Sequence, residues 1–203
     1  MDPQFELVGE MGLLIRREVA AGFASQEEII RSAVQIHGGE ATQKELRELA
    51  EELAGSFFHQ HLQAQRGWPL VTDCDRLDLA FAQLAEKGIV IGHDLKDDGA
   101  EQFMDEMDEA ADGLHPARGY VFYQRRGTEA AIDGHGLYLD YGAAGDDDDD
   151  DEDGNENERA ALRIGHEVAE ALRRQGLKVD WDGTLSRRIR VRLDWKRRRN
   201  WSD

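Results

Sequence analysis

The stretch that decides the fold runs from Arg188 to Trp195 and reads Arg-Ile-Arg-Val-Arg-Leu-Asp-Trp. Apolar residues stand at every second position from Ile189 onward, and charged residues stand between them. Because successive side chains of a strand point to opposite faces, this alternation predicts a strand with one face in a core and the other face basic. The basic face carries Arg188, Arg190 and Arg192.

This basic strand, with the positive residues that follow it as far as Arg199, has two interpretations. One is phosphate or RNA binding, because arginines near tryptophan combine charge with stacking. The other is that the arginines cover acidic neighbours and protect the edge of a sheet. The chain contains 43 Asp and Glu residues against 25 Lys and Arg, so we favour the second interpretation.

Outward from this strand, the C-terminal two thirds of the chain alternate between short apolar runs and amphipathic segments. A turn signal, Asp182-Gly183-Thr184, links the last two runs. Strands are predicted at residues 89–91, 120–123, 137–141, 177–181 and 188–195, and helices at 73–87, 101–111 and 158–175, with a short helical turn opening at Thr128. The predicted class is α+β, with a mixed or antiparallel sheet of about five strands backed by helices.

The first third of the chain is predicted to be helical and to pack with this sheet. Ser25 with Glu28, and Thr42 with Glu45, match the capping box of a helix N-terminus, and each pair precedes an apolar stripe. We expect a single domain at residues 1–203, with a helical part at 1–66 and an α/β part at 71–195.

Composition narrows the class of protein. The 203 residues carry a formal net charge of −18, which argues against binding to DNA or to a membrane and favours a basic protein as the partner. The single cysteine excludes an intramolecular disulfide, and we find neither a secretory signal nor an apolar run of about 18 residues. We therefore expect a cytoplasmic protein. The acidic run from Asp146 to Asp153 predicts a disordered acidic loop at residues 145–157.

The sequence contains none of the motifs G-x-S-x-G, Walker A and H-E-x-x-H, which are typical of catalytic, nucleotide-binding and metal sites. Cys74 stands between Asp73 and Asp75 at a predicted helix start. The helix terminus favours a reactive thiolate and the two carboxylates oppose it, so a reactive thiol is the less favoured interpretation. We expect no catalytic residue, no metal and no cofactor, and we lean against an enzyme.

The first function hypothesis is a non-enzymatic module that binds a basic protein, and its most concrete version is an immunity protein that neutralises a toxin. Its candidate contacts are acidic side chains on a predicted helix and tyrosines that face outward. They are Asp105, Glu106, Asp108, Glu109, Tyr120, Tyr123, Tyr138 and Tyr141.

Two alternatives remain open. One is a small-ligand binder or enzyme with a pocket between the helical part and the sheet, formed by polar residues at element ends. Its candidates are Asp73, Cys74, Arg126, Thr128 and Glu129. The other is phosphate or RNA binding through Arg188, Arg190, Arg192 and the basic residues that follow.

Several strings, taken together, resemble a known family. They are Arg17-Glu18-Val19-Ala20-Ala21-Gly22-Phe23, Val71-Thr72-Asp73-Cys74-Asp75-Arg76-Leu77, Gly119-Tyr120-Val121-Phe122-Tyr123, Gly136-Leu137-Tyr138-Leu139 and Val179-Asp180-Trp181-Asp182-Gly183. Over nearly its whole length the chain is similar to an uncharacterised bacterial family of about 200 residues, a domain of unknown function. The resemblance implies no activity and no catalytic residues. Many members have a cysteine cluster after the strand at 89–91, but this chain reads Gly92-His93-Asp94-Leu95-Lys96 there, so a metal or redox role does not carry over.

Overall fold

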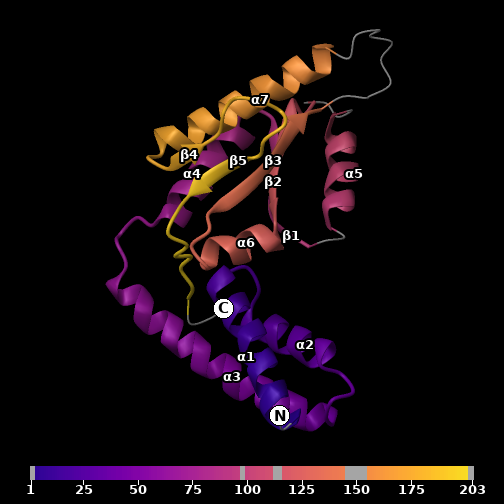
Figure 1. The fold of residues 1–203 in the computed structure, drawn as a ribbon, viewed down its shortest axis with the longest axis vertical. Coiled ribbons are helices and arrows are strands. Elements are labelled where there is room, and N and C mark those ends of the chain that lie inside the picture. Colours follow the sequence, from indigo (N-terminus) through magenta and orange to yellow (C-terminus); the bar gives the residue numbers. More distant parts are fainter. Residues whose placement is uncertain (1–2, 97–98, 112–115, 145–154, 201–203) are drawn as a thin grey trace. The chain divides into compact units, whose positions relative to one another are not determined.

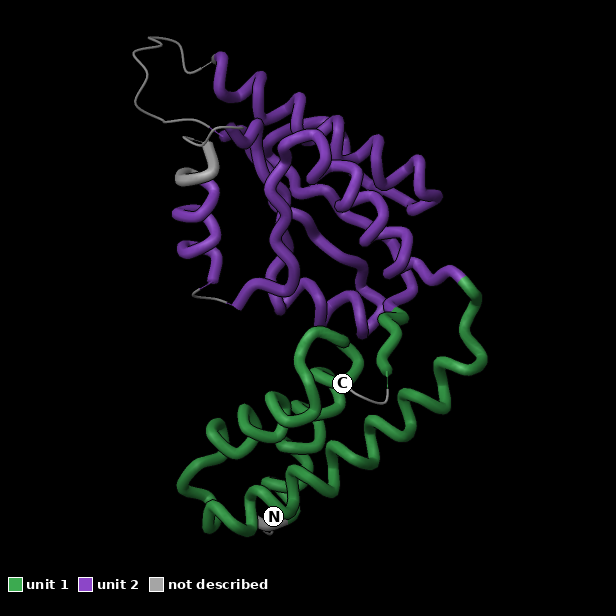
Figure 2. The backbone as a smooth tube through the Cα atoms, turned by 180° about the vertical axis from the view of Figure 1, so that it is seen from behind, with its two compact units in different colours: residues 1–70, 196–203 green, residues 71–195 purple. Residues whose placement is uncertain are grey.

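The computed structural model describes residues 3–96, 99–111, 116–144 and 155–200. The chain forms two compact units. The first contains residues 1–70 and 196–203, and the second contains residues 71–195 (Figure 2). Each unit has its own cluster of buried apolar side chains. The second unit is therefore an insertion in the sequence of the first.

The first unit is helical. Its elements are α1 (Pro3–Ala21), α2 (Gln26–Ile36), α3 (Gln43–Ala64) and the short 3-10 helix η1 (Gln65–Gly67). Both predicted capping boxes are confirmed: Ser25 Oγ accepts the Glu28 N–H, and Thr42 Oγ1 accepts the Glu45 N–H, each at 3.3 Å. Each helix buries one apolar stripe, and the most buried members include Met11, Ile15, Ile29, Ala33, Leu46 and Ala50.

The C-terminal residues after the second unit complete the helical unit. Arg199 is 3% exposed, and its guanidinium donates to the backbone carbonyls of Glu18, Val19 and Ala24 at 3.1, 2.8 and 2.8 Å. Its guanidinium carbon also lies 4.6 Å from the centroid of the Phe58 ring. The three hydrogen bonds join residues that are 175 to 181 positions apart in the sequence.

The second unit contains the sheet. Its elements are α4 (Asp73–Ala85), β1 (Ile89–Leu95), α5 (Gly99–Ala111), β2 (Gly119–Gln124), α6 (Arg125–Ile132), β3 (Leu137–Ala143), α7 (Asn155–Arg174), β4 (Lys178–Asp180) and β5 (Ile189–Arg192). Over the described residues, the sheet has five strands in the order β1-β2-β3-β5-β4. β1 and β2 are parallel, and the other neighbours are antiparallel. The predicted α+β class with a mixed sheet is confirmed.

The two faces of this sheet are covered differently. α4 and α7 cover one face (Figure 1), where Val121 and Leu139 pack with Val168 in the core of the unit. On the other face, α5 covers β1 and β2, and the ring centroid of its Phe103 lies 5.3 Å from that of Phe122. We call this second face the arginine face, because β5 directs its arginines there.

Three details differ from the predictions. β5 is Ile189–Arg192 rather than 188–195, because its partners are short: β3 pairs with residues 189–191 and β4 pairs with residues 190–192. β5 also lies between β3 and β4, so its arginines do not protect a sheet edge. α6 begins at Arg125, directly after β2, and not at Thr128.

The expected disordered loop at 145–157 lies for the most part outside the described residues, and residues 155–157 are the first turn of α7. Over the described part of the chain, no helix combines the length and the apolar character needed to cross a membrane.

Candidate functional site

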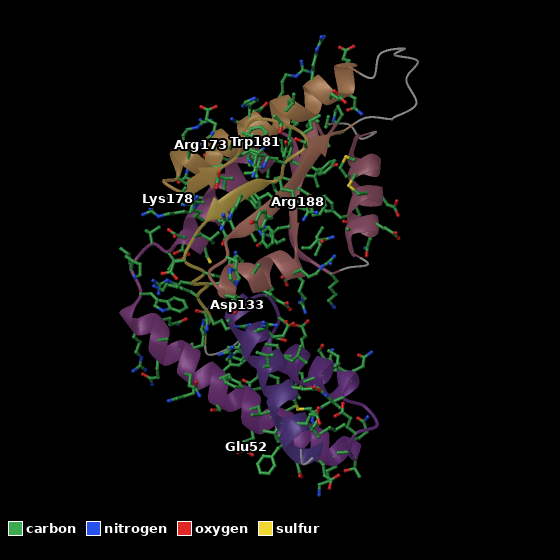
Figure 3. The ribbon with its side chains drawn as sticks, viewed as in Figure 1. Glu52, Asp133, Arg173, Lys178, Trp181 and Arg188 are labelled. Atoms are coloured by element: carbon green, nitrogen blue, oxygen red, sulfur yellow. The ribbon has the colours of Figure 1, made fainter. Side chains whose placement is uncertain are left out.

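A pocket of about 280 Å³ opens on the arginine face, within the second unit. Its lining comes from the end of β2, from α6, from β3 and from the segment just before β5. The lining residues are Gln124, Arg126, Gly127, Ala130, Tyr138, Asp140 and Arg188. Figure 3 labels Arg188 beside the strands of the sheet. The fold thus brings two arginines from distant parts of the sequence into one pocket.

The strand register explains why polar side chains gather at this place. Tyr138 and Asp140 are two residues apart on β3, so both point to the arginine face. Tyr138 pairs with Arg190 of β5, and Asp140 pairs with Phe122 of β2. Leu139, which lies between them, faces the core instead, so the apolar and the polar side chains of this part of β3 are on opposite faces.

A second arrangement holds α6 beside the pocket. Asp94 is buried near the irregular end of β1 and has a positive φ of 50°, a conformation that is uncommon outside glycine. Its carboxylate accepts a hydrogen bond from Thr128 Oγ1 at 2.6 Å and forms an ion pair with Arg125 Nη2 at 3.1 Å. Both partners belong to the first turns of α6. Asp94 therefore anchors the segment that presents Arg126 and Gly127 to the pocket.

The pocket contains an internal ion pair. Arg188 Nε lies 2.7 Å from Asp140 Oδ1. Burial raises the pKa of the Asp140 carboxyl, and the charge and hydrogen bond of Arg188 offset part of that rise. Among the described residues that line the pocket, two are arginines and one is a carboxylate, so the lining is positive overall.

One wall of the pocket is aromatic. Tyr138 is 40% exposed, and the guanidinium carbon of Arg190 lies 5.7 Å from its ring centroid. Arg190 Nη2 also donates to the carbonyl of His135 at 2.9 Å. These contacts hold the guanidinium in place beside the ring, so Tyr138 offers a supported apolar surface to a ligand.

The predicted arginine surface from 188 to 199 is not one array. On the sheet, Arg188 pairs with Asp140 and Arg192 pairs with Asp180 at 3.1 Å. Each of these two arginines therefore covers an acidic neighbour, and the choice between this role and phosphate binding stays a prediction. Arg199 belongs to the helical unit, where it is buried.

The residues expected to contact a basic protein have mixed positions. Asp105 and Glu106 are exposed on α5, and the side chains of Asp108 and Glu109 lie outside the described residues. Tyr123 is 0% exposed, so it does not face outward, because β2 directs it into the core. Tyr120 and Tyr141 are half-buried. Docking of a basic partner and neutralisation of a toxin stay predictions.

The residues expected at element ends do not form one cluster. Asp73 accepts the backbone N–H of Asp194 at 3.0 Å, and Cys74 is 1% exposed in the core. Thr128 is buried against Asp94, and Glu129 is half-buried on α6. Of these five candidates, the pocket lining includes Arg126 alone. A buried thiol is poorly placed to react with a solute.

Sequence reasoning named three of the lining residues and missed others. Arg126, Tyr138 and Arg188 are sequence candidates that the structure brings together. Asp140 and Gln124 were not candidates. The available signal for Asp140 was its place in the alternation of the strand at 137–141, where it shares a face with Tyr138. Nothing local marks Gln124, which gains its position because β2 ends beside α6.

Within the described ranges, no three His, Cys, Asp or Glu side chains are grouped as they would need to be to hold a metal ion. The chemistry that the pocket offers is ionic and hydrogen-bonding recognition by guanidinium, amide and carboxylate groups.

Comparison with known proteins gives a family and no activity. Searches of curated proteins and of solved structures each found no match. A family model described as Domain of unknown function (DUF6891) matches residues 5–199. That match spans both compact units and includes every residue that lines the pocket. The chain therefore belongs to the family Domain of unknown function (DUF6891).

Proposed function

We propose that this protein binds a small molecule through an anionic group, a carboxylate or a phosphate, in the pocket on the arginine face. The observation that carries the proposal is the convergence of Arg126 and Arg188 on one pocket of about 280 Å³. Guanidinium groups present forked donors that match the oxygens of carboxylate and phosphate groups.

The size and lining of the pocket support a small ligand. Pockets for drug-sized molecules start at about 300 Å³, so this pocket suits a compact ligand. The amide of Gln124 adds hydrogen-bonding capacity, and the Tyr138 ring adds an apolar wall. This combination of a few polar groups and one flat surface is typical of a binding site for a small polar molecule.

The charge of the whole chain makes this location distinctive. With a formal net charge of −18, the chain as a whole repels an anion. A pocket with two arginines and one carboxylate is a local exception to that rule. The two arginines therefore make the pocket a favourable place for an anion that approaches this protein.

The test is a titration of the full chain with inorganic sulfate and, separately, with inorganic phosphate. NMR and calorimetry monitor the binding. We expect saturable binding, with shifts concentrated on residues 124–130 and 138–140. In R188A the affinity falls about tenfold or more, because one charge-assisted contact contributes roughly 1.5–3 kcal/mol.

The chain offers a matched control in Arg192. Arg188 and Arg192 are similarly exposed, at 59% and 62% of their side chains, and each pairs with one carboxylate. Arg192 does not line the pocket. R192A therefore binds the anions as the parent does. Equal losses in R188A and R192A, or no saturable binding to the parent, would contradict the proposal.

A further inference from the structure

The ion pair inside the pocket has a consequence for binding. The shortest contact of Arg188 with a carboxylate is the 2.7 Å approach of its Nε to Asp140 Oδ1, and both residues line the pocket. An anionic ligand seated in the pocket is a second acceptor for the same guanidinium. The ligand and Asp140 therefore compete for Arg188.

The surroundings of Asp140 decide what happens when it loses this competition. Its register partner on β2 is Phe122, an apolar residue. On the same face lie Arg126 from α6, Tyr138 on β3, Tyr120 on β2, and Arg190 and Arg192 on β5, the second of them paired with Asp180 of β4. The helix α5 over this face carries the exposed carboxylates of Glu101, Asp105 and Glu106. α7 and α4 lie against the opposite face of the sheet. Arg188 is the charged group that contacts Asp140 directly, at 2.7 Å.

Removal of Arg188 from Asp140 leaves a half-buried carboxylate next to a negatively charged ligand. Both the burial and the like charge disfavour the ionised form of a carboxyl group. Uptake of one proton removes the repulsion and gives the carboxyl an O–H that can donate to an oxygen of the ligand. The charge balance of the pocket is then restored, since one negative ligand charge replaces the charge of Asp140.

We propose that an anion binds this pocket by ion-pair exchange, in which Arg188 moves from Asp140 to the ligand and Asp140 takes up one proton. This inference rests on the proposed function and adds that pH regulates the binding of the anion. By linkage, a reaction that takes up a proton is favoured as pH falls. The pocket therefore holds its anion more tightly in mildly acidic conditions than at neutral pH.

The test uses inorganic sulfate, which stays fully ionised over the range, so that any pH dependence comes from the protein. Calorimetric titrations of the full chain at pH 5 and pH 7.5 give the affinity, and buffers of different ionisation enthalpy give the number of protons taken up. We expect proton uptake that approaches one per sulfate, and an affinity that falls with rising pH by up to about tenfold per unit. This proton count needs no variant.

Two variants sharpen the test. D140N has no carboxyl to protonate, so it binds sulfate with no proton uptake and with an affinity that is nearly independent of pH. Asp180 supplies the control, since it forms an ion pair with Arg192, at 3.1 Å, outside the pocket. D180N therefore keeps the proton uptake and the pH profile of the parent.

The outcomes separate the two proposals. Saturable sulfate binding with no proton uptake, or a D140N protein that keeps the parent profile, overturns the ion-pair exchange and leaves the anion pocket in place. Absence of sulfate and phosphate binding to the parent at both pH values overturns the exchange and the proposed function together.

Discussion

Arg190 and Arg199 are the same residue type in one basic stretch of sequence, but the structure uses them differently. Arg190 lies on the sheet, partly exposed, with its guanidinium near the Tyr138 ring and one hydrogen bond to the His135 carbonyl. Arg199 is 3% exposed and donates to three backbone carbonyls of the helical unit. Arg190 therefore lies at the surface of the sheet, whereas Arg199 is part of the buried interior of the helical unit.

The difference shows that the partners of an arginine decide its contribution. A side chain that pairs with another exposed side chain contributes little to stability, because water and salt screen the pair. A buried guanidinium that satisfies backbone carbonyls contributes more, because its removal leaves those acceptors buried without a donor. Substitution by alanine therefore distinguishes the arginines on the sheet, Arg190 and Arg192, from the buried Arg199.

The largest effect is expected for R199A. This substitution removes the guanidinium donor from the carbonyls of Glu18, Val19 and Ala24, of which Glu18 keeps the N–H of Gly22, and we expect a loss of about 3 kcal/mol in the free energy of unfolding of the helical unit. Urea unfolding followed by circular dichroism gives the stability, and hydrogen exchange at the amides of α1 and α3 assigns the loss to this unit.

R192A is the matched control for R199A. Arg192 forms an exposed ion pair with Asp180, so its removal changes the stability by no more than about 0.5 kcal/mol. If R192A and R199A were equally destabilising, the distinction between the two groups of arginines would be wrong.

An intermediate effect is expected for R190A. The variant loses the contact with the Tyr138 ring and the hydrogen bond to His135, for a cost of about 1 kcal/mol in the free energy of unfolding. R190K keeps a positive charge but not the planar fork, so its stability falls between the parent and R190A. The same unfolding measurement checks both variants, and a loss as large as that of R199A would count against this assignment.

The smallest effect concerns pH and the segment that carries Arg199. The Nε2 of His61 lies 2.9 Å from the Arg197 carbonyl and donates to it. Burial lowers the pKa of His61, the hydrogen bond to Arg197 raises it, and the charge of Arg199 lowers it further, with a net lowering. Below an unfolded pKa of about 6.5, the unfolded chain binds a proton more readily than the folded chain. The contribution of His61 is therefore complete above that pH and is lost as pH falls toward the lowered folded pKa.

The measurement is the free energy of unfolding at several pH values between 7.5 and 5. H61Q keeps an N–H donor for the Arg197 carbonyl but does not titrate, so it is the matched variant. We expect the parent to lose more stability than H61Q over this interval. Parallel pH profiles would show that His61 does not contribute in this way.

Local interactions explain what could be predicted. The capping boxes at Ser25 and Thr42 join residues three positions apart, so the sequence carries all the information for those helix starts. Alternation predicted β5, but its length depends on β3 and β4, which lie elsewhere in the chain. The start of α6 was predicted too late, because Gln124 makes no side-chain capping hydrogen bond that would mark the boundary.

The sequence by itself determined the α+β class, most helices and strands, and the presence of a basic strand face, because these follow from periodicity and from contacts between near neighbours. The tertiary structure alone decided that β5 lies inside the sheet, that Arg188 meets Asp140 and Arg126 in one pocket, and that Arg199 enters the helical unit. Each of these facts depends on which distant residues share a surface, and a single sequence has no local pattern that records such pairings.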